Sequence, residues 1–246
     1  NVVDFQHPER NKWAVTHQVT IIENGQQKRP DVILYLNGIP VVVMELKNAV
    51  DENATIDKAY TQLQTYHNTI PSLFAYNVFE LISDGLEAKV GTITSSFSRF
   101  MSWKTADGKT MANNRISELQ VMMDGLLSVD VLAELIQNFI VFERFTSEDP
   151  VTKTISTGVV KKLAAYHQYY AVKKAVVSTQ SAAGSDGDKK GGVVWHTQGS
   201  GKSLSMVFYT GLLVRMMNNP TVIVITDRND LDDQLFSEVF APDEML

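Results

Sequence analysis

Hydrophobic and polar positions alternate with two different periods in the first part of the chain. Apolar, β-branched runs over 32–36 and 39–47 flank Asn37-Gly38, which predicts a β-hairpin. Other strands are expected over 15–22, 73–82 and 89–94. Apolar positions three and four residues apart predict helices over 55–70, 113–127 and 129–145.

The second part of the chain has a different order of elements. The run 191–195 predicts a short buried strand, residues 204–217 an apolar helix, and 222–227 a further strand. The small, polar residues 178–190 indicate a flexible loop. A second polar stretch, 146–150, follows the helix expected over 129–145. We therefore predict one domain over 1–145 and the beginning of another over 146–246.

Composition narrows the functional classes. The 246 residues contain no cysteine, which excludes disulfides and cysteine-ligated metal centres. The net charge of −6 disfavours a non-specific nucleic-acid binder. No apolar run approaches the roughly 18–20 residues of a membrane-spanning helix, so we expect no membrane association. The first residues do not resemble a secretory signal, so a cytoplasmic protein is expected, and the missing initiator Met suggests part of a longer chain.

Acidic and basic side chains gather at the open end of the predicted hairpin. Asp31 begins its first strand, and Glu45 and Lys47 end its second. Residues two apart in a strand share a face, so Glu45 and Lys47 project together. Two converging carboxylates suit Mg²⁺, and a neighbouring lysine can orient water and offset phosphate charge. This set predicts metal-dependent hydrolysis of a phosphodiester, although Glu-x-Lys alone is also common as the polar end of a strand.

The register of the hairpin decides whether the carboxylates converge. A two-residue turn at Asn37-Gly38 in a regular ladder pairs residue 31 with residue 44. Asp31 and Glu45 would then project from different faces of the hairpin. A three-residue turn with Gly38 as a bulge pairs 31 with 43 and gives Asp31 the face of Glu45 and Lys47. We predict the bulged turn, or a kink at Asp31 with the same effect.

The following helix and a later glycine-rich loop add two further motifs. Gln62 and Tyr66 are four apart and share a helix face, where Tyr66 is either a half-buried aromatic or part of the acidic site. Residues 196–203, His-Thr-Gln-Gly-Ser-Gly-Lys-Ser, lie between a predicted strand and a helix, as a phosphate-binding loop requires. Its binding residues for ATP and Mg²⁺ would be Thr197, Gly199, Ser200, Gly201, Lys202 and Ser203, with Lys202 on the β/γ-phosphates and the Ser203 hydroxyl on the Mg²⁺ ion. His196 replaces the usual first glycine.

These motifs resemble those of a known family. Pro30-Asp31, Glu45-Leu46-Lys47 and Gln62-x-x-x-Tyr66 resemble the PD-(D/E)xK nucleases, and residues 29–48 resemble the nuclease domain of type I restriction enzyme R subunits. The resemblance implies an α/β fold with a mixed sheet flanked by helices, followed by a partial RecA-like motor domain. It also implies Asp31 and Glu45 as Mg²⁺ ligands, Lys47 as the catalytic lysine and Gln62 and Tyr66 as auxiliary residues.

The same resemblance extends to the motor part and to partners. His167-Gln168 resembles the segment before the phosphate loop, where Gln168 would contact adenine, although an amphipathic helix explains it equally well. Residues 226–235 resemble a DNA-contacting motif rather than a Walker B strand. R subunits translocate double-stranded DNA with ATP, cut it, and work with methyltransferase (M) and specificity (S) subunits. Glu9 and Glu23 are weak candidates for an additional acidic residue that many such nucleases carry.

Two other functions remain open at this point. One is a DNA-repair nuclease–helicase, which uses similar parts without methyltransferase partners. The other is an ATP-gated DNA-binding module with an inactive nuclease site, in which Asp31 and Glu45 would bind no Mg²⁺.

We expect residues 1–246 alone to have negligible ATPase activity. The sequence contains no convincing Asp-Glu Walker B pair and no second RecA-like domain with its arginine, which phosphoryl transfer needs to hold Mg²⁺ and stabilise charge. A steady-state phosphate-release assay with and without duplex DNA checks this. Measurable DNA-stimulated turnover would contradict it.

Overall fold

The computed structural model describes residues 2–48, 55–113, 115–148, 152–217 and 220–225. The chain forms two compact units, and each is described by itself. The first comprises Asn1–Gln137 together with Lys161–Leu163, and the second Asn138–Val160 together with Ala164–Leu246. The predicted domain boundary between 145 and 146 lies inside a strand of the second unit, and the two predicted domains stay a prediction.

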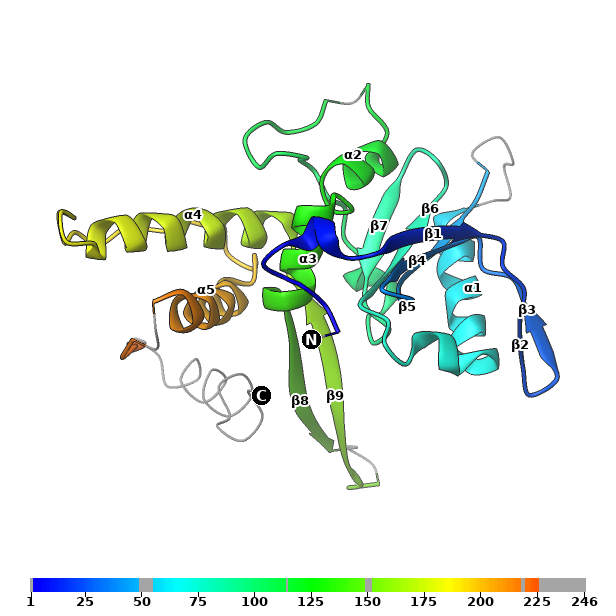
Figure 1. Ribbon diagram of the computed structural model, residues 1–246. Coiled ribbons are helices and arrows are strands. Elements are labelled where there is room, and N and C mark those ends of the chain that lie inside the picture. Colours follow the sequence, from blue (N-terminus) through cyan, green and yellow to red (C-terminus); the bar gives the residue numbers. More distant parts are fainter. Residues whose placement is uncertain (1, 49–54, 114, 149–151, 218–219, 226–246) are drawn as a thin grey trace. The chain divides into compact units, whose positions relative to one another are not determined.

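A five-stranded mixed sheet forms the centre of the first unit (Figure 1). Its order is β1 (Trp13–His17), β4 (Val32–Leu36), β5 (Ile39–Leu46), β6 (Phe79–Ser83) and β7 (Ala88–Gly91). Only β5 and β6 are parallel, because the chain between them crosses over through α1 (Ile56–Thr69). The mixed sheet with flanking helices is the fold class expected from the sequence.

The edge of this sheet differs from the prediction. The single strand expected over 15–22 is interrupted at Gln18, whose φ of 49° leaves the extended region. Ile21 instead begins a separate two-stranded sheet of β2 (Ile21–Glu23) and β3 (Gln26–Lys28). The strands expected over 73–82 and 89–94 are found as β6 and β7, with Pro71–Phe74 forming the 3-10 helix η2 before them.

The hairpin of β4 and β5 keeps a two-residue turn, so the predicted bulge at Gly38 is wrong. Leu36 pairs with Ile39 around Asn37 and Gly38, which both have positive φ. The register then shifts beyond Tyr35 and Pro40, so that Leu34 pairs with Val42. Pro40 has no N–H to donate to the ladder, which explains the irregularity at this position. The shift pairs Val32 with Met44, so Asp31 lies directly across from Glu45 on the neighbouring strand. The two carboxylates therefore share one face of the hairpin, as the bulged turn was expected to bring about.

One face of the sheet is covered by α1 (Figure 1). Ile56, Ala59, Leu63 and Tyr66 recur every three or four residues and are buried, as the periodicity predicted. They pack in one apolar cluster with the following sheet and loop residues: Ile33, Val43, Ile82 and Phe100. Burial of this helix stripe fixes which α1 side chains approach β5 and β6.

The helices after β7 are shorter than expected. The helix expected over 113–127 is α2 (Glu118–Asp124), where the Ser117 hydroxyl caps the first turn by accepting from Gln120 N. The helix expected over 129–145 is α3 (Val129–Asn138), and Ile140–Glu148 forms the strand β8. Ile140 and Phe142 belong to a β-branched and aromatic run that pairs with β9 (Ile155–Leu163), and this pairing replaces the helix.

The described part of the second unit contains β8, the part of β9 before Lys161, and two helices. The helix α4 (Tyr166–Ala183) extends into the loop that was expected over 178–190. The helix α5 (Lys202–Met216) corresponds to the one predicted over 204–217. Phe139, the residue before β8, packs against Tyr169 of α4 and Phe208 of α5, with ring centroids 4.8 and 5.4 Å away. This aromatic cluster joins the two helices to the beginning of β8.

The two strands expected next to the phosphate loop are not formed. Residues 191–195 belong to no strand, and Trp195 is 83% exposed rather than buried. The described part of the other run, Val222–Ile225, is likewise outside any strand. A strand needs at least one neighbouring strand to pair its N–H and C=O groups, and the described residues supply none here. Residues 226–235 lie outside the described residues.

Gly91→Ala should destabilise the first unit by overpacking. A Cβ at residue 91 would lie 2.5 Å from two carbon atoms of the Phe100 ring, which is itself 6% exposed. We expect a loss of about 1–3 kcal/mol in the free energy of unfolding, measured by urea denaturation. Gly211→Ala is the control, because its Cβ meets nothing within 4 Å and lies inside α5. Equal stability of the Gly91→Ala protein and the wild type would contradict the packing.

Candidate functional site

Asp31 and Glu45 converge at the end of the β4–β5 hairpin. The Asp31 Oδ2 atom accepts a hydrogen bond of 2.9 Å from the backbone N–H of Leu46, directly after Glu45. Glu45 is 3% exposed, so its carboxylate is almost withdrawn from water. Burial raises the pKa of the Glu45 carboxyl, a hydrogen bond from Lys47 opposes this, and the charge of Asp31 raises that pKa again.

Lys47 closes the site on its solvent side. Its Nζ atom lies 2.6 Å from Glu45 Oε1, and the lysine side chain is 24% exposed against 4% for that of Glu45. The backbone N–H of Lys47 donates to Ser83 O at 2.7 Å, which holds this end of β5 beside β6. The ammonium group therefore neutralises Glu45 while keeping access to solvent.

Tyr66 of α1 reaches the same carboxylate, and Gln62 of the same helix forms a hydrogen bond with Tyr66. The Tyr66 hydroxyl donates to Glu45 Oε2 at 3.1 Å and lies 3.4 Å from Arg29 O. Burial and then the charge of Glu45 raise the pKa of Tyr66, and a hydrogen bond with Gln62 acts in the opposite direction. The structure thus brings together all five residues that the sequence predicted for this site: Asp31, Glu45, Lys47, Gln62 and Tyr66.

The donor set fits a divalent cation that retains water. Two carboxylates supply hard oxygen ligands, and the effect of Asp31 on the pKa of Glu45 shows that their charges interact. Within the described ranges no group of three or more His, Asp or Glu side chains is placed to hold a metal. A Mg²⁺ ion bound here would therefore use Asp31 and Glu45, with waters completing its shell.

Neither candidate for an additional acidic residue joins this pair through a contact that the structure shows. Glu9 lies 3.7 Å from His7 on the surface. Glu23 accepts hydrogen bonds from the backbone and hydroxyl of Ser72. The contacts that the structure shows for Glu9 and Glu23 are therefore with His7 and Ser72 and not with Asp31 or Glu45.

The glycine-rich loop of the second unit turns sharply directly before α5. Gly199 and Gly201 have φ of 78° and 76°, in the left-handed region that glycine adopts without strain. α5 begins directly afterwards at Lys202, so its N-terminal N–H groups point toward the loop. Lys202 Nζ donates to Thr197 O at 3.0 Å, within the turn, and Ser203 is the next residue of the helix.

Gln168 supports the loop from α4. Its Oε1 accepts from Ala165 N at 2.8 Å, and its Nε2 donates to Gly201 O at 2.9 Å. A Cβ at residue 201 would lie 2.5 Å from that Nε2, so this approach requires glycine. His167 Nε2 lies 3.0 Å from the carbonyl of Ser200, which adds a second contact. The contact of Gln168 with adenine stays a prediction.

Comparison with known proteins gives the family. Residues 1–99 match the model of the type I restriction enzyme R protein N terminus, and residues 167–244 match that of the SWI2/SNF2 ATPase. The chain belongs to the type I restriction enzyme R proteins. Its predicted membership is thereby confirmed, and the ATPase match implies ATP as the ligand of the second unit.

Individual R-protein relatives agree with this assignment. The chain is 45% identical over 240 residues to the type I restriction enzyme HindI endonuclease subunit of Haemophilus influenzae, covering 96% of this chain and 22% of that protein. It is 32% identical over 270 residues to a Methanocaldococcus jannaschii protein provisionally named type I restriction enzyme MjaIXP endonuclease subunit. That alignment covers 99% of this chain and 24% of the relative. The chain thus spans under a quarter of the length of these relatives. No helix in the described part of the chain is long and apolar enough to cross a membrane.

The R-protein chain contains a second buried carboxylate that the sequence analysis missed. Glu80, the second residue of β6, is 0% exposed and forms an ion pair with His67. The signal was present, because Glu80 is the one charged residue in the otherwise uncharged run 77–83. An acidic residue in a fully buried strand is rare unless it is paired.

Glu45→Gln should stabilise the fold at neutral pH. The folded-state pKa of Glu45 is raised above its ordinary value of 4.5. Protonation of Glu45 therefore stabilises the folded state, fully below pH 4.5 and less and less as the pH rises through the folded-state pKa. The amide of the Glu45→Gln protein stays uncharged at every pH. Its free energy of unfolding should therefore exceed that of the wild type at pH 7, and the difference should vanish below pH 4.5.

Chemical denaturation from pH 4 to 8 measures this difference. Glu87→Gln is the control, since the Glu87 side chain is 59% exposed. A Glu45→Gln protein less stable than wild type at pH 7 would show that the contacts of the carboxylate outweigh its burial.

Proposed function

We propose that this chain forms the nuclease site and the nucleotide-binding beginning of a type I restriction enzyme R subunit. The full subunit would cleave double-stranded DNA with Mg²⁺, coupled to ATP-driven translocation. It would act in a complex with M and S subunits, which would supply sequence recognition. The observation that carries the proposal is the meeting of Asp31, directly before β4, with Glu45 and Lys47 at the end of β5.

Each side chain of this site has a distinct task. Asp31 and Glu45 would hold Mg²⁺, which when bound polarises the phosphodiester and lowers the pKa of water. Lys47 carries the positive charge nearest to solvent, so its ammonium can orient the attacking water or offset phosphate charge. Tyr66 holds Glu45 Oε2 and so fixes the direction of the carboxylate. Asp31 is fixed in turn by the backbone N–H of Leu46.

The second unit supports the ATP-dependent part of the proposal. Gly199 and Gly201 turn the loop in front of α5, and Lys202 begins that helix. Ser203 would contribute its hydroxyl to the Mg²⁺ that accompanies ATP. A match to R-protein relatives over at least 96% of the chain supports restriction over a DNA-repair nuclease–helicase.

Two substitutions in the full-length R subunit, assembled with its partners, should separate the activities. Asp31→Ala removes a metal ligand and should reduce DNA cleavage more than about 100-fold while translocation and ATP hydrolysis remain nearly intact. Lys202→Ala should abolish ATP hydrolysis and, with it, cleavage that depends on translocation.

The assays are plasmid linearisation, triplex displacement for translocation, and phosphate release. Asp124→Ala, an exposed aspartate of α2, is the matched control and should leave all three unchanged. If Asp31→Ala removes cleavage and translocation together, the division of tasks between the two units is wrong. Wild-type cleavage by the Asp31→Ala enzyme would refute the nuclease site.

A further inference from the structure

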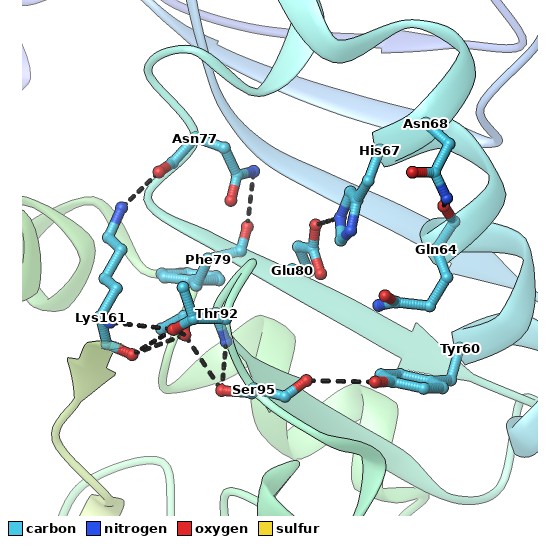
Figure 2. Close-up of polar contacts among 11 residues, drawn as sticks. Tyr60, Gln64, His67, Asn68, Asn77, Phe79, Glu80, Thr92, Ser95 and Lys161 are labelled. Carbon is cyan, nitrogen blue, oxygen red and sulfur yellow. Dashed lines mark hydrogen bonds and ion pairs between the residues drawn. The ribbon is translucent and has the colours of Figure 1, made fainter. Parts of the chain in front are cut away.

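Glu80 occupies an energetically costly position for a carboxylate. It is fully buried as the second residue of β6, where it pairs with Val43 of β5 and Gly91 of β7. Its Oε1 atom forms the ion pair with His67 Nε2, as Figure 2 shows. Its Oε2 atom is buried and has no hydrogen-bond partner among the described residues. Apolar side chains commonly replace a buried ion pair at no loss of stability, so stability alone does not account for Glu80.

Lys161 is a second charge that acts on Glu80 within the first unit. Burial lowers the pKa of Lys161 to about 8, and the charge of Glu80 raises it. Its Nζ donates to the carbonyl of Asn77 (Figure 2). Its backbone is held by two hydroxyls: Thr92 Oγ1 donates to Lys161 O at 2.7 Å, and Lys161 N donates to Thr94 Oγ1 at 2.9 Å. The buried carboxylate is therefore compensated by His67 and by a fixed lysine.

The ion pair is connected to the proposed nuclease site through α1. Tyr66 and His67 are consecutive residues of this helix, and they bind carboxylates on neighbouring strands. Glu45 lies on β5 and Glu80 on β6. The parallel register places Val43 beside Glu80 and Glu45 beside Ile82, so both carboxylates lie on the sheet face that α1 covers.

Two adjacent anchors fix the helix more tightly than one. Consecutive residues of an α-helix point about 100° apart around its axis. A rotation or shift that moves the Tyr66 hydroxyl away from Glu45 must therefore also disturb His67. The His67 ring has little freedom, since it packs edge-on against the buried ring of Phe74 at 4.6 Å between centroids.

We propose that Glu80 and His67 are positioning residues for DNA cleavage, because their ion pair sets α1 so that the Tyr66 hydroxyl holds Glu45 in its working orientation. This inference rests on the proposed nuclease function. Neither residue touches DNA or the cation, and both act through Tyr66. Displacement of a catalytic group by about 1 Å can cost about 100-fold in rate, so a loosened helix should have a large effect.

The test uses the full-length R subunit in its complex, with rates measured at saturating DNA over a range of Mg²⁺ concentrations. Glu80→Ala and His67→Ala should each lower the cleavage rate about 10- to 100-fold, and they should raise the Mg²⁺ concentration for half-maximal rate because Glu45 is a proposed Mg²⁺ ligand. Glu80→Gln keeps an oxygen that accepts from His67 and should recover part of the loss. Glu87→Ala, at an exposed carboxylate of the same unit, is the matched control and should cleave at the wild-type rate.

Combination with Tyr66→Phe separates positioning from a merely structural role. If the ion pair acts through the Tyr66 hydroxyl, Glu80→Ala or His67→Ala should cause little further loss in a Tyr66→Phe background. ATP hydrolysis should remain at the wild-type level in every one of these variants. Glu80→Gln keeps the test decisive if an alanine variant fails to fold, because it leaves no unpaired buried charge and fills the same space on β6.

Each other result counts against the inference. Wild-type cleavage by the His67 and Glu80 variants, with Asp31→Ala inactive, overturns the positioning role and leaves the nuclease function standing. Losses that multiply with that of Tyr66→Phe, or that include ATP hydrolysis, also overturn it by showing an independent or general structural effect. Wild-type cleavage by Asp31→Ala identifies the failure of the proposed function itself.

Discussion

The burial of the Glu45 carboxylate is the constraint on which the first unit depends. A carboxylate that is 3% exposed loses most of its hydration, and the cost is met only if charged and polar groups surround it. Lys47 supplies the charge from the same strand, and Tyr66 supplies a hydroxyl from α1. Because these partners come from β5 and from the crossover helix, the site requires the packing of α1 on the sheet.

A local irregularity determines which face of the sheet carries the acidic pair. The Asn37-Gly38 turn by itself would place Asp31 and Glu45 on opposite faces. The register shift beyond Pro40 adds one residue to β5 and brings Asp31 opposite Glu45. A single proline next to the turn thus has a consequence for side chains five residues further along the strand.

The two units differ in how much of their chemistry is local. In the phosphate loop, Gly199, Gly201 and the beginning of α5 form within one short segment, and Gln168 adds support from α4. The strands expected on either side need hydrogen-bond partners from elsewhere in a sheet, and they remain unpaired in the described residues. The turn at Gly199 and Gly201 therefore forms without a paired strand beside it in the described residues.

The sequence by itself predicted the hairpin, the α1 stripe, the glycine-rich loop and Glu45 with the four residues gathered around it. These depend on periodicity, turn chemistry and spacing, which are properties of short segments. Tertiary structure decided the end of α3 at Asn138, where pairing with β9 replaced helical hydrogen bonds, and it decided the true position of the bulge. It also decided the pairing of Glu80 with His67, thirteen residues apart, since only the packing of α1 across β6 brings an imidazole to a carboxylate that no local pattern could pair.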